Sequence, residues 1–197
     1  MKIRILSLIV AGFILVGCQA FFGNASTITS SEVAAPVWIS SRNNQVTLLY
    51  TSDINLRKLE ARLRTRYFSV SAAERDLFTN PSYNTEKRIV SRLESILLRT
   101  EQVLAMYPSS LELKIKIFRN REELNQEHLR LLGSMQRYKS FYIHGFETIY
   151  TSMQDISDSV ISHEMAHVVM DNYFNVIPPE KTAELLATYV DSNLEGE

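Results

Sequence analysis

The stretch His163-Glu164-Met165-Ala166-His167 carries the most specific chemical signal in the chain. It lies in a segment whose apolar residues recur at helical spacing. Positions four apart share one face of a helix, so both imidazoles can reach one ion. Neutral imidazole is a good zinc ligand, and Glu164 stands beside the first histidine, where its carboxylate can act on a metal-bound water. Two ordinary core or surface histidines are the alternative, so the surroundings of the motif decide.

A break and a second helical pattern follow the motif. Pro178 and Pro179 end the first helix, and the next helix, from about Glu180 to Ser192, can fold back onto it. That second helix carries two candidate third ligands. Glu184 lies inside it, and Glu180 lies at its start, where the helix dipole already favours a carboxylate.

This arrangement resembles the gluzincin group of zinc metalloproteases over about residues 111–191. In that group H-E-x-x-H is followed, after a turn and within a second helix, by a glutamate that completes the zinc site. The resemblance implies one Zn²⁺ per chain, held by His163, His167 and Glu184, with a fourth position left for water. It also implies hydrolysis of peptide bonds, with Glu164 as the general base.

The glutamate helix departs from the pattern of the group at three positions. Ala183 replaces an asparagine and Leu185 replaces a glycine, while Thr188 stands where some members place an aspartate that orients the first histidine. Asp191, one turn further along the same face, is the expected substitute. The departures bear on these supporting roles more than on the zinc ligands.

The remaining pattern predicts one α+β domain, a minimal zincin-like fold over residues 45–197. An antiparallel edge strand of a small mixed sheet is expected to pack on the motif helix, followed by the glutamate helix. The strand from Glu147 to Ser152 is the predicted edge, and a peptide or protein substrate is expected to add to it. The other expected elements are helices over about 53–68, 85–106, 121–132 and 157–174, and strands over about 111–117 and 140–144.

The N-terminus predicts export and lipid attachment. A basic start and a short apolar run, too short to span a bilayer, give residues 1–17 the proportions of a signal peptide. The run ends at Leu15-Val16-Gly17-Cys18, which resembles the lipobox of bacterial lipoproteins, and Cys18 is the only cysteine in the chain. A lipid on Cys18 would anchor the protein to a membrane, and residues 18–44, rich in Ser, Thr, Asn and Ala, are expected to form a flexible tether.

Location and partners follow from charge and from the lipobox. The chain balances 21 basic against 22 acidic residues, which does not favour nucleic-acid binding. A lipoprotein is expected in the bacterial cell envelope. In a Gram-negative cell, Gln19 favours the outer membrane, facing the periplasm, because aspartate at that position favours retention in the inner membrane.

Several side chains near the motif have no assigned role. Tyr142, Tyr150, Tyr173 and His144 are candidate donors to an oxyanion, and no large second lobe covers the cleft, so an open site or a partner chain that completes it is expected. His128 is expected to be solvated. Asp171, one turn beyond His167, is expected to support a ligand or to face solvent. The competing interpretation is a non-catalytic, zinc-stabilised binding or structural lipoprotein of the envelope.

Overall fold

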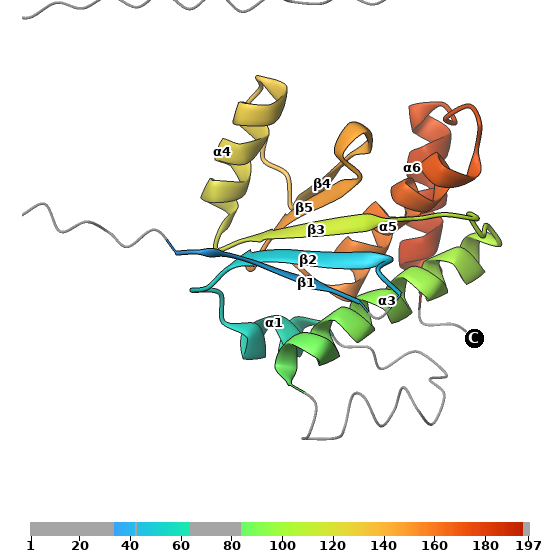
Figure 1. Cartoon of the computed structure of the whole chain (residues 1–197). Helices are drawn as coiled ribbons and strands as arrows, with labels where there is room; N and C mark the ends of the chain where they lie inside the picture. The colour runs from blue at the N-terminus through green and yellow to red at the C-terminus, as the bar shows by residue number, and fades with distance from the viewer. Residues whose placement is uncertain (1–33, 42, 64–83, 195–197) are drawn as a thin grey trace, which may run out of the picture. The chain divides into compact units, whose positions relative to one another are not determined.

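The computed structural model describes residues 34–41, 43–63 and 84–194. The predicted signal peptide, Cys18 and most of the predicted tether lie outside these residues, as does the part of the first predicted helix beyond Leu63. The described part forms an α+β fold with a mixed five-stranded sheet (Figure 1). In the described part of the chain, no helix is long and apolar enough to cross a membrane.

The strands of the sheet lie in the order β1-β2-β3-β5-β4. The pairs β2–β3 and β3–β5 are parallel, and both outer pairs, β1–β2 and β5–β4, are antiparallel. The bounds are β1 Pro36–Ser40, β2 Val46–Thr51, β3 Leu113–Phe118, β4 Ser140–Ile143 and β5 Thr148–Ser152. The strand predicted over 111–117 is confirmed, with the expected alternation of buried and wetter positions.

The position of the edge strand corrects one prediction. The strand from Glu147 to Ser152 was expected at the edge, but β5 pairs with β3 on one side and with β4 on the other. All five of its residues are buried, as a strand between two neighbours and two layers requires. The antiparallel edge is therefore β4, whose outer side has no partner strand in the described part of the chain.

The structured part also begins earlier than residue 45. Strand β1 lies in the segment predicted to be tether, and it pairs along its whole length with β2, from Pro36 opposite Thr51 to Ser40 opposite Thr47. Its residues alternate between exposed and half-buried, so the strand is held by backbone pairing more than by burial.

Four of the helices in the described part of the chain begin at a side-chain cap. Asn120 caps α4 Arg121–Leu132, which ends at Gly133 in the left-handed conformation, and Ser157 caps α5 Asp158–Tyr173. Asn84 caps α3 Thr85–Leu104. Asp53, where the first helix was predicted to begin, is not its cap. Asn55 caps α1 Leu56–Arg62 instead, while Asp53 accepts a hydrogen bond from Thr51.

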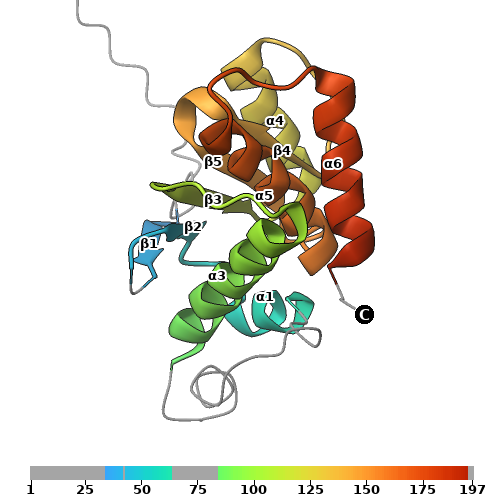
Figure 2. The same cartoon turned by 90° about the vertical axis from the view of Figure 1, so that its right-hand side faces the viewer.

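Helices cover both faces of the sheet (Figures 1 and 2). On one face the apolar side chains of β2, β3 and β5 pack against α3 and α5 and form the main core, which includes Leu48, Leu93, Ile115, Ile149 and Met165. On the other face α4 covers a smaller cluster, in which Tyr150 is stacked on Phe141.

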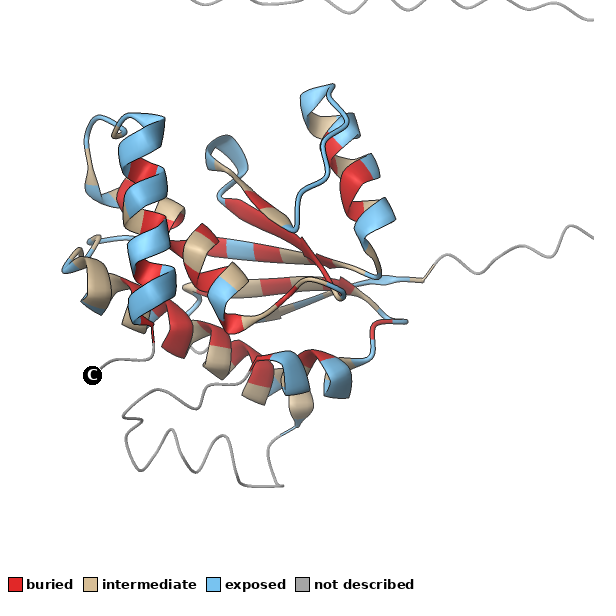
Figure 3. Cartoon of the chain, turned by 180° about the vertical axis from the view of Figure 1, so that it is seen from behind, coloured by how far each residue is buried: buried red, intermediate tan, exposed pale blue. Residues whose placement is uncertain are grey.

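The last helix, α6 Glu180–Asn193, packs on α5 through small side chains. Ala166 of α5 and Ala187 of α6 are fully buried between them, so the two backbones approach closely. The outer face of α6 is exposed and its inner face is buried (Figure 3). Arg99 of α3 donates to the carbonyl oxygens of Asn193 and Leu194 and so holds the end of α6.

Candidate metal centre

The two histidines of the motif lie one turn apart on α5. Their ring centroids are 5.2 Å apart, and both side chains are partly exposed while their neighbours Met165, Ala166 and Val168 are buried. The buried residues of α5 hold the helix in place. Both imidazoles project from its remaining face, toward the same side.

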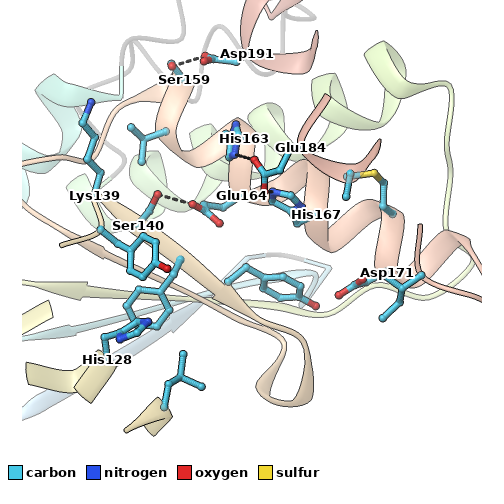
Figure 4. Close-up of a pocket in the computed structure, with 18 of the residues that line it drawn as sticks. His128, Lys139, Ser140, Ser159, His163, Glu164, His167, Asp171, Glu184 and Asp191 are labelled. Carbon is cyan, nitrogen blue, oxygen red and sulfur yellow. Dashed lines mark hydrogen bonds and ion pairs between the residues drawn. The ribbon is translucent and has the colours of Figure 1, made fainter. Parts of the chain in front are cut away.

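Glu184 reaches this pair from α6. Its Oε2 lies 3.4 Å from Nε2 of His163, and its Oε1 lies 3.3 Å from Nε2 of His167. Figure 4 shows the carboxylate between the two rings. Among the described residues these are the three side chains whose possible ligand atoms converge, all within 4.8 Å of one another. Glu180 does not belong to the group.

The spacing and chemistry of these atoms fit zinc. Ligand atoms at about 2.1 Å from a tetrahedral ion lie about 3.4 Å from one another, which is the separation of each imidazole nitrogen from its carboxylate oxygen. Two nitrogens and a carboxylate are a known donor set for catalytic zinc, and three protein ligands leave one position open.

Glu164 is not part of that group and points to the sheet instead. Its Oε1 accepts a hydrogen bond of 2.6 Å from the hydroxyl of Ser140, the first residue of β4. The residue is 7% exposed, and burial raises the pKa of its carboxyl, an effect opposed by the bond from Ser140 and by the neighbouring His163. The arrangement gives a shielded carboxylate with one fixed donor, next to the converging ligands.

The surroundings of His167 favour its neutral imidazole. Burial lowers its pKa, and the carboxylates of Glu184 and Asp171 act in the opposite direction. A neutral imidazole has a free nitrogen lone pair, which metal binding requires.

A cleft of about 710 Å³ runs beside the three converging side chains. One wall is the edge strand β4 with the loop before it, and the other is formed by α5 and α6. The residues that line it include Arg137, Lys139, Ser140, Tyr142, Ser159, His163, Glu164, His167, Asp171, Glu184 and Asp191.

A second polar pair lies at the far end of β4. Nδ1 of His144 lies 2.8 Å from Oδ2 of Asp171, whose side chain is only 10% exposed. The hydroxyl of Tyr142 is buried, and burial, together with the charge of Asp171, raises the pKa of this phenol. Asp171 therefore lies against the edge strand, on the wall of the cleft.

The structure also places the other candidate side chains. Asp191, which was expected to orient the first histidine, accepts a hydrogen bond from Ser159. Tyr150 packs under α4, on the opposite face of the sheet from α5. Tyr173 is half exposed near the end of α5. His128 is buried rather than solvated, and its Nδ1 is 2.7 Å from the carbonyl oxygen of Ser134.

Ser140 is the site residue that the sequence did not single out. A serine at the start of a predicted strand carries no chemical signal of its own. Its role depends on how the sheet packs against α5, which no local pattern specifies. Comparison of the chain with protein-family models, with curated proteins and with solved structures finds no match.

Proposed function

We propose that the protein is a zinc metallopeptidase of the gluzincin type. The observation that supports this most directly is the convergence of His163, His167 and Glu184 beside a buried Glu164, on the wall of a cleft bounded by an exposed strand edge. A metal site that served stability alone would not need an acidic side chain fixed next to its open side.

The three converging side chains would hold one zinc ion. Bound there, zinc would supply a Lewis acid that polarises a peptide carbonyl and lowers the pKa of a water towards neutrality. Glu164 takes the proton from the attacking water and passes it to the leaving amine. The hydroxyl of Ser140 keeps the carboxylate of Glu164 in one orientation during both transfers.

The substrate backbone adds to β4. No strand of the described part of the chain pairs with the outer side of β4, so its backbone can bind an extended peptide whatever the side chains of that peptide are. Such a peptide lies in the cleft between β4 and the helices, within reach of Glu164. The open front of the cleft admits a folded protein segment or leaves room for a partner chain.

The chain is further proposed to be a lipoprotein of the bacterial envelope, tethered by a lipid on Cys18. In a Gram-negative cell the domain would face the periplasm from the outer membrane. Labelling of the full chain with a palmitate analogue, lost in Cys18→Ala, tests the attachment independently of catalysis.

The decisive experiment compares the full chain with Glu164→Gln. We expect one zinc per chain in both proteins and cleavage of an unfolded protein substrate, such as casein, only by the first. Zinc binding without hydrolysis, and envelope phenotypes unaffected by Glu164→Gln, would support the non-catalytic, zinc-stabilised binding lipoprotein. Failure of the full chain to bind zinc at neutral pH would contradict both.

A further inference from the structure

The two ends of the cleft carry opposite charges, and this difference indicates the direction in which a peptide would bind. Two contacts fix the direction of the cleft. Ser140, at the start of β4, bonds to Glu164 near the beginning of the motif, and His144, just after β4, pairs with Asp171 two turns further along α5. Strand β4 and helix α5 therefore run side by side in the same direction.

Cations stand at the beginning of β4. Arg137 and Lys139 are exposed, line the cleft and form no ion pair with a described residue. The ion-pair partner of Asp155 is Arg121. The charge of Lys139 contributes only a weaker Coulombic effect, which helps to lower the pKa of Asp155. Figure 4 shows Lys139 next to Ser140, at the opposite end of the cleft from Asp171.

The other end of β4 carries the opposite charge. Asp171 is held there against the strand by His144. Between the two ends lie His163, His167 and Glu184 (Figure 4). Two acidic side chains line the cleft from α6. Glu184 lies at the two histidines, and Asp191 is bonded to Ser159 in the first turn of α5, so its carboxylate already has a partner at the Ser140 end of the cleft.

A peptide bound antiparallel to β4 matches this order. Antiparallel pairing is slightly the more stable of the two and would place the amino end of the peptide toward Asp171. The carboxyl end then passes Lys139 and Arg137. Because Ser140 and Glu164 mark the place of the bond that is cut, the residues directly after that bond lie against the two cations.

We propose that Lys139 and Arg137 bind a carboxylate on the first or second residue after the bond that is cleaved, and that the enzyme prefers peptides that carry one there. This preference rests on the proposed peptidase function and on strand addition to β4. The carboxylate comes either from an acidic side chain or from the free C-terminus of a short peptide. Both sources present the same chemistry to the two cations.

Matched synthetic peptides test the preference. Neutral decapeptides carrying Glu, Gln or Lys at a single scanned position, each with a free or an amidated C-terminus, are incubated with the zinc-loaded full chain in a nonionic detergent. Mass spectrometry locates the cuts. Two exposed cations give a preference of about three- to tenfold in kcat/KM for Glu over Gln, with Lys disfavoured. A preference confined to free C-termini identifies the terminal carboxylate as the source.

Variants connect the preference to the two residues. Arg137→Ala combined with Lys139→Ala is expected to bring the Glu-to-Gln ratio within about twofold of unity, and Lys139→Glu is expected to invert it. Lys58→Ala, which removes an exposed cation on α1 outside the cleft, is the control and keeps the ratio. The ratio of the full chain should also shrink as salt is raised.

Failure of this inference differs from failure of the proposed function. Cleavage without a charge preference, or a preference that survives the double substitution, overturns the role of the two cations and leaves the peptidase intact. If zinc is bound and no peptide is cut, binding of fluorescent Glu and Lys peptides to Glu164→Gln decides the matter. Equal binding of both peptides then overturns the inference as well.

Discussion

The hydroxyl of Ser140 donates a 2.6 Å hydrogen bond to Oε1 of Glu164, and this bond joins the edge strand of the sheet to the motif helix. The strand proposed to bind the substrate backbone thereby also holds the carboxylate proposed as general base. In the proposed mechanism, strand addition and proton transfer therefore both depend on the position of Ser140. A shift of β4 would disturb both.

Removal of that hydroxyl should slow hydrolysis without loss of metal. In Ser140→Ala the carboxylate of Glu164 loses the hydrogen bond from the Ser140 hydroxyl and can turn away from the cleft. We expect kcat to fall about tenfold, with KM and zinc content little changed, because misorientation of a general base acts on the chemical step. Ser140→Thr retains a hydroxyl and should restore most of the rate. An unchanged kcat in Ser140→Ala would show that the bond does not position the base.

Substitution of Glu184 should cost the metal itself. Glu184→Ala removes one of three converging ligands, so we expect zinc affinity to fall by more than about 100-fold, measured by competition with a chromogenic chelator. Zinc should then raise the melting temperature much less, because the stabilisation by a ligand shrinks as its dissociation constant rises above its free concentration. Glu180→Ala, on the same helix but outside the group, is the matched control and should bind zinc normally. Loss of zinc from the control would reassign the third ligand.

The packing of α6 on α5 is expected to affect zinc binding, although the packed residues are not themselves ligands. Ala187 is fully buried against α5, and Ala187→Leu would push α6 away and carry Glu184 with it. We expect a loss of about 1–3 kcal/mol in unfolding free energy, measured with urea, together with weaker zinc binding. Leu185→Ala changes an exposed neighbour on the same helix and should alter the free energy of unfolding by less than about 0.5 kcal/mol. Equal effects of the two changes would contradict this packing.

A pH dependence of stability is expected from Glu127, away from the cleft. Bonds from Arg130 and Lys116 lower the pKa of this carboxyl to about 2 against an ordinary value of 4.5. A pKa lowered by folding stabilises the protein above the ordinary value, and this stabilisation disappears as pH falls from about 4.5 to 2. Because both cations are partly exposed, we expect about 1–2 kcal/mol rather than the full shift.

Glu127→Gln tests this dependence. Urea unfolding of the variant at pH 7 and at pH 3 should show a smaller loss of stability on acidification than the unsubstituted chain does. Glu122→Gln, an exposed glutamate on the same helix, serves as control and should leave the acid sensitivity unchanged. Parallel curves for the unsubstituted chain and Glu127→Gln would mean that the ion pairs with Lys116 and Arg130 contribute nothing measurable.

Local patterns predicted most of the helices. The bounds of α4 follow from Asn120 and Gly133, which act within a few residues of themselves, and the spacing within the motif is a property of any helix. The grouping of Glu184 with the two histidines also agrees with its predicted place in the second helix.

The errors concern arrangements that depend on distant parts of the chain. No local pattern in β5 indicates that β3 pairs with it on the side opposite to β4. The short, partly exposed β1 is a strand only because β2 lies beside it. His128 looked like a solvated residue of a polar helix, but its ring is covered by Tyr138 and Phe141. Each of these environments is created by tertiary packing, which residue type and periodicity do not encode.

The two edges of the sheet have a mechanical consequence. Chain preceding Pro36 enters the fold at β1, while the cleft lies along β4 at the opposite edge. A pull from the N-terminal side would load the pairing of Pro36 with Thr51 first, and the hairpin would open there one pair at a time. Three other strands separate this point from β4, so opening of the β1–β2 hairpin would leave the pairing of β4 with β5 in place.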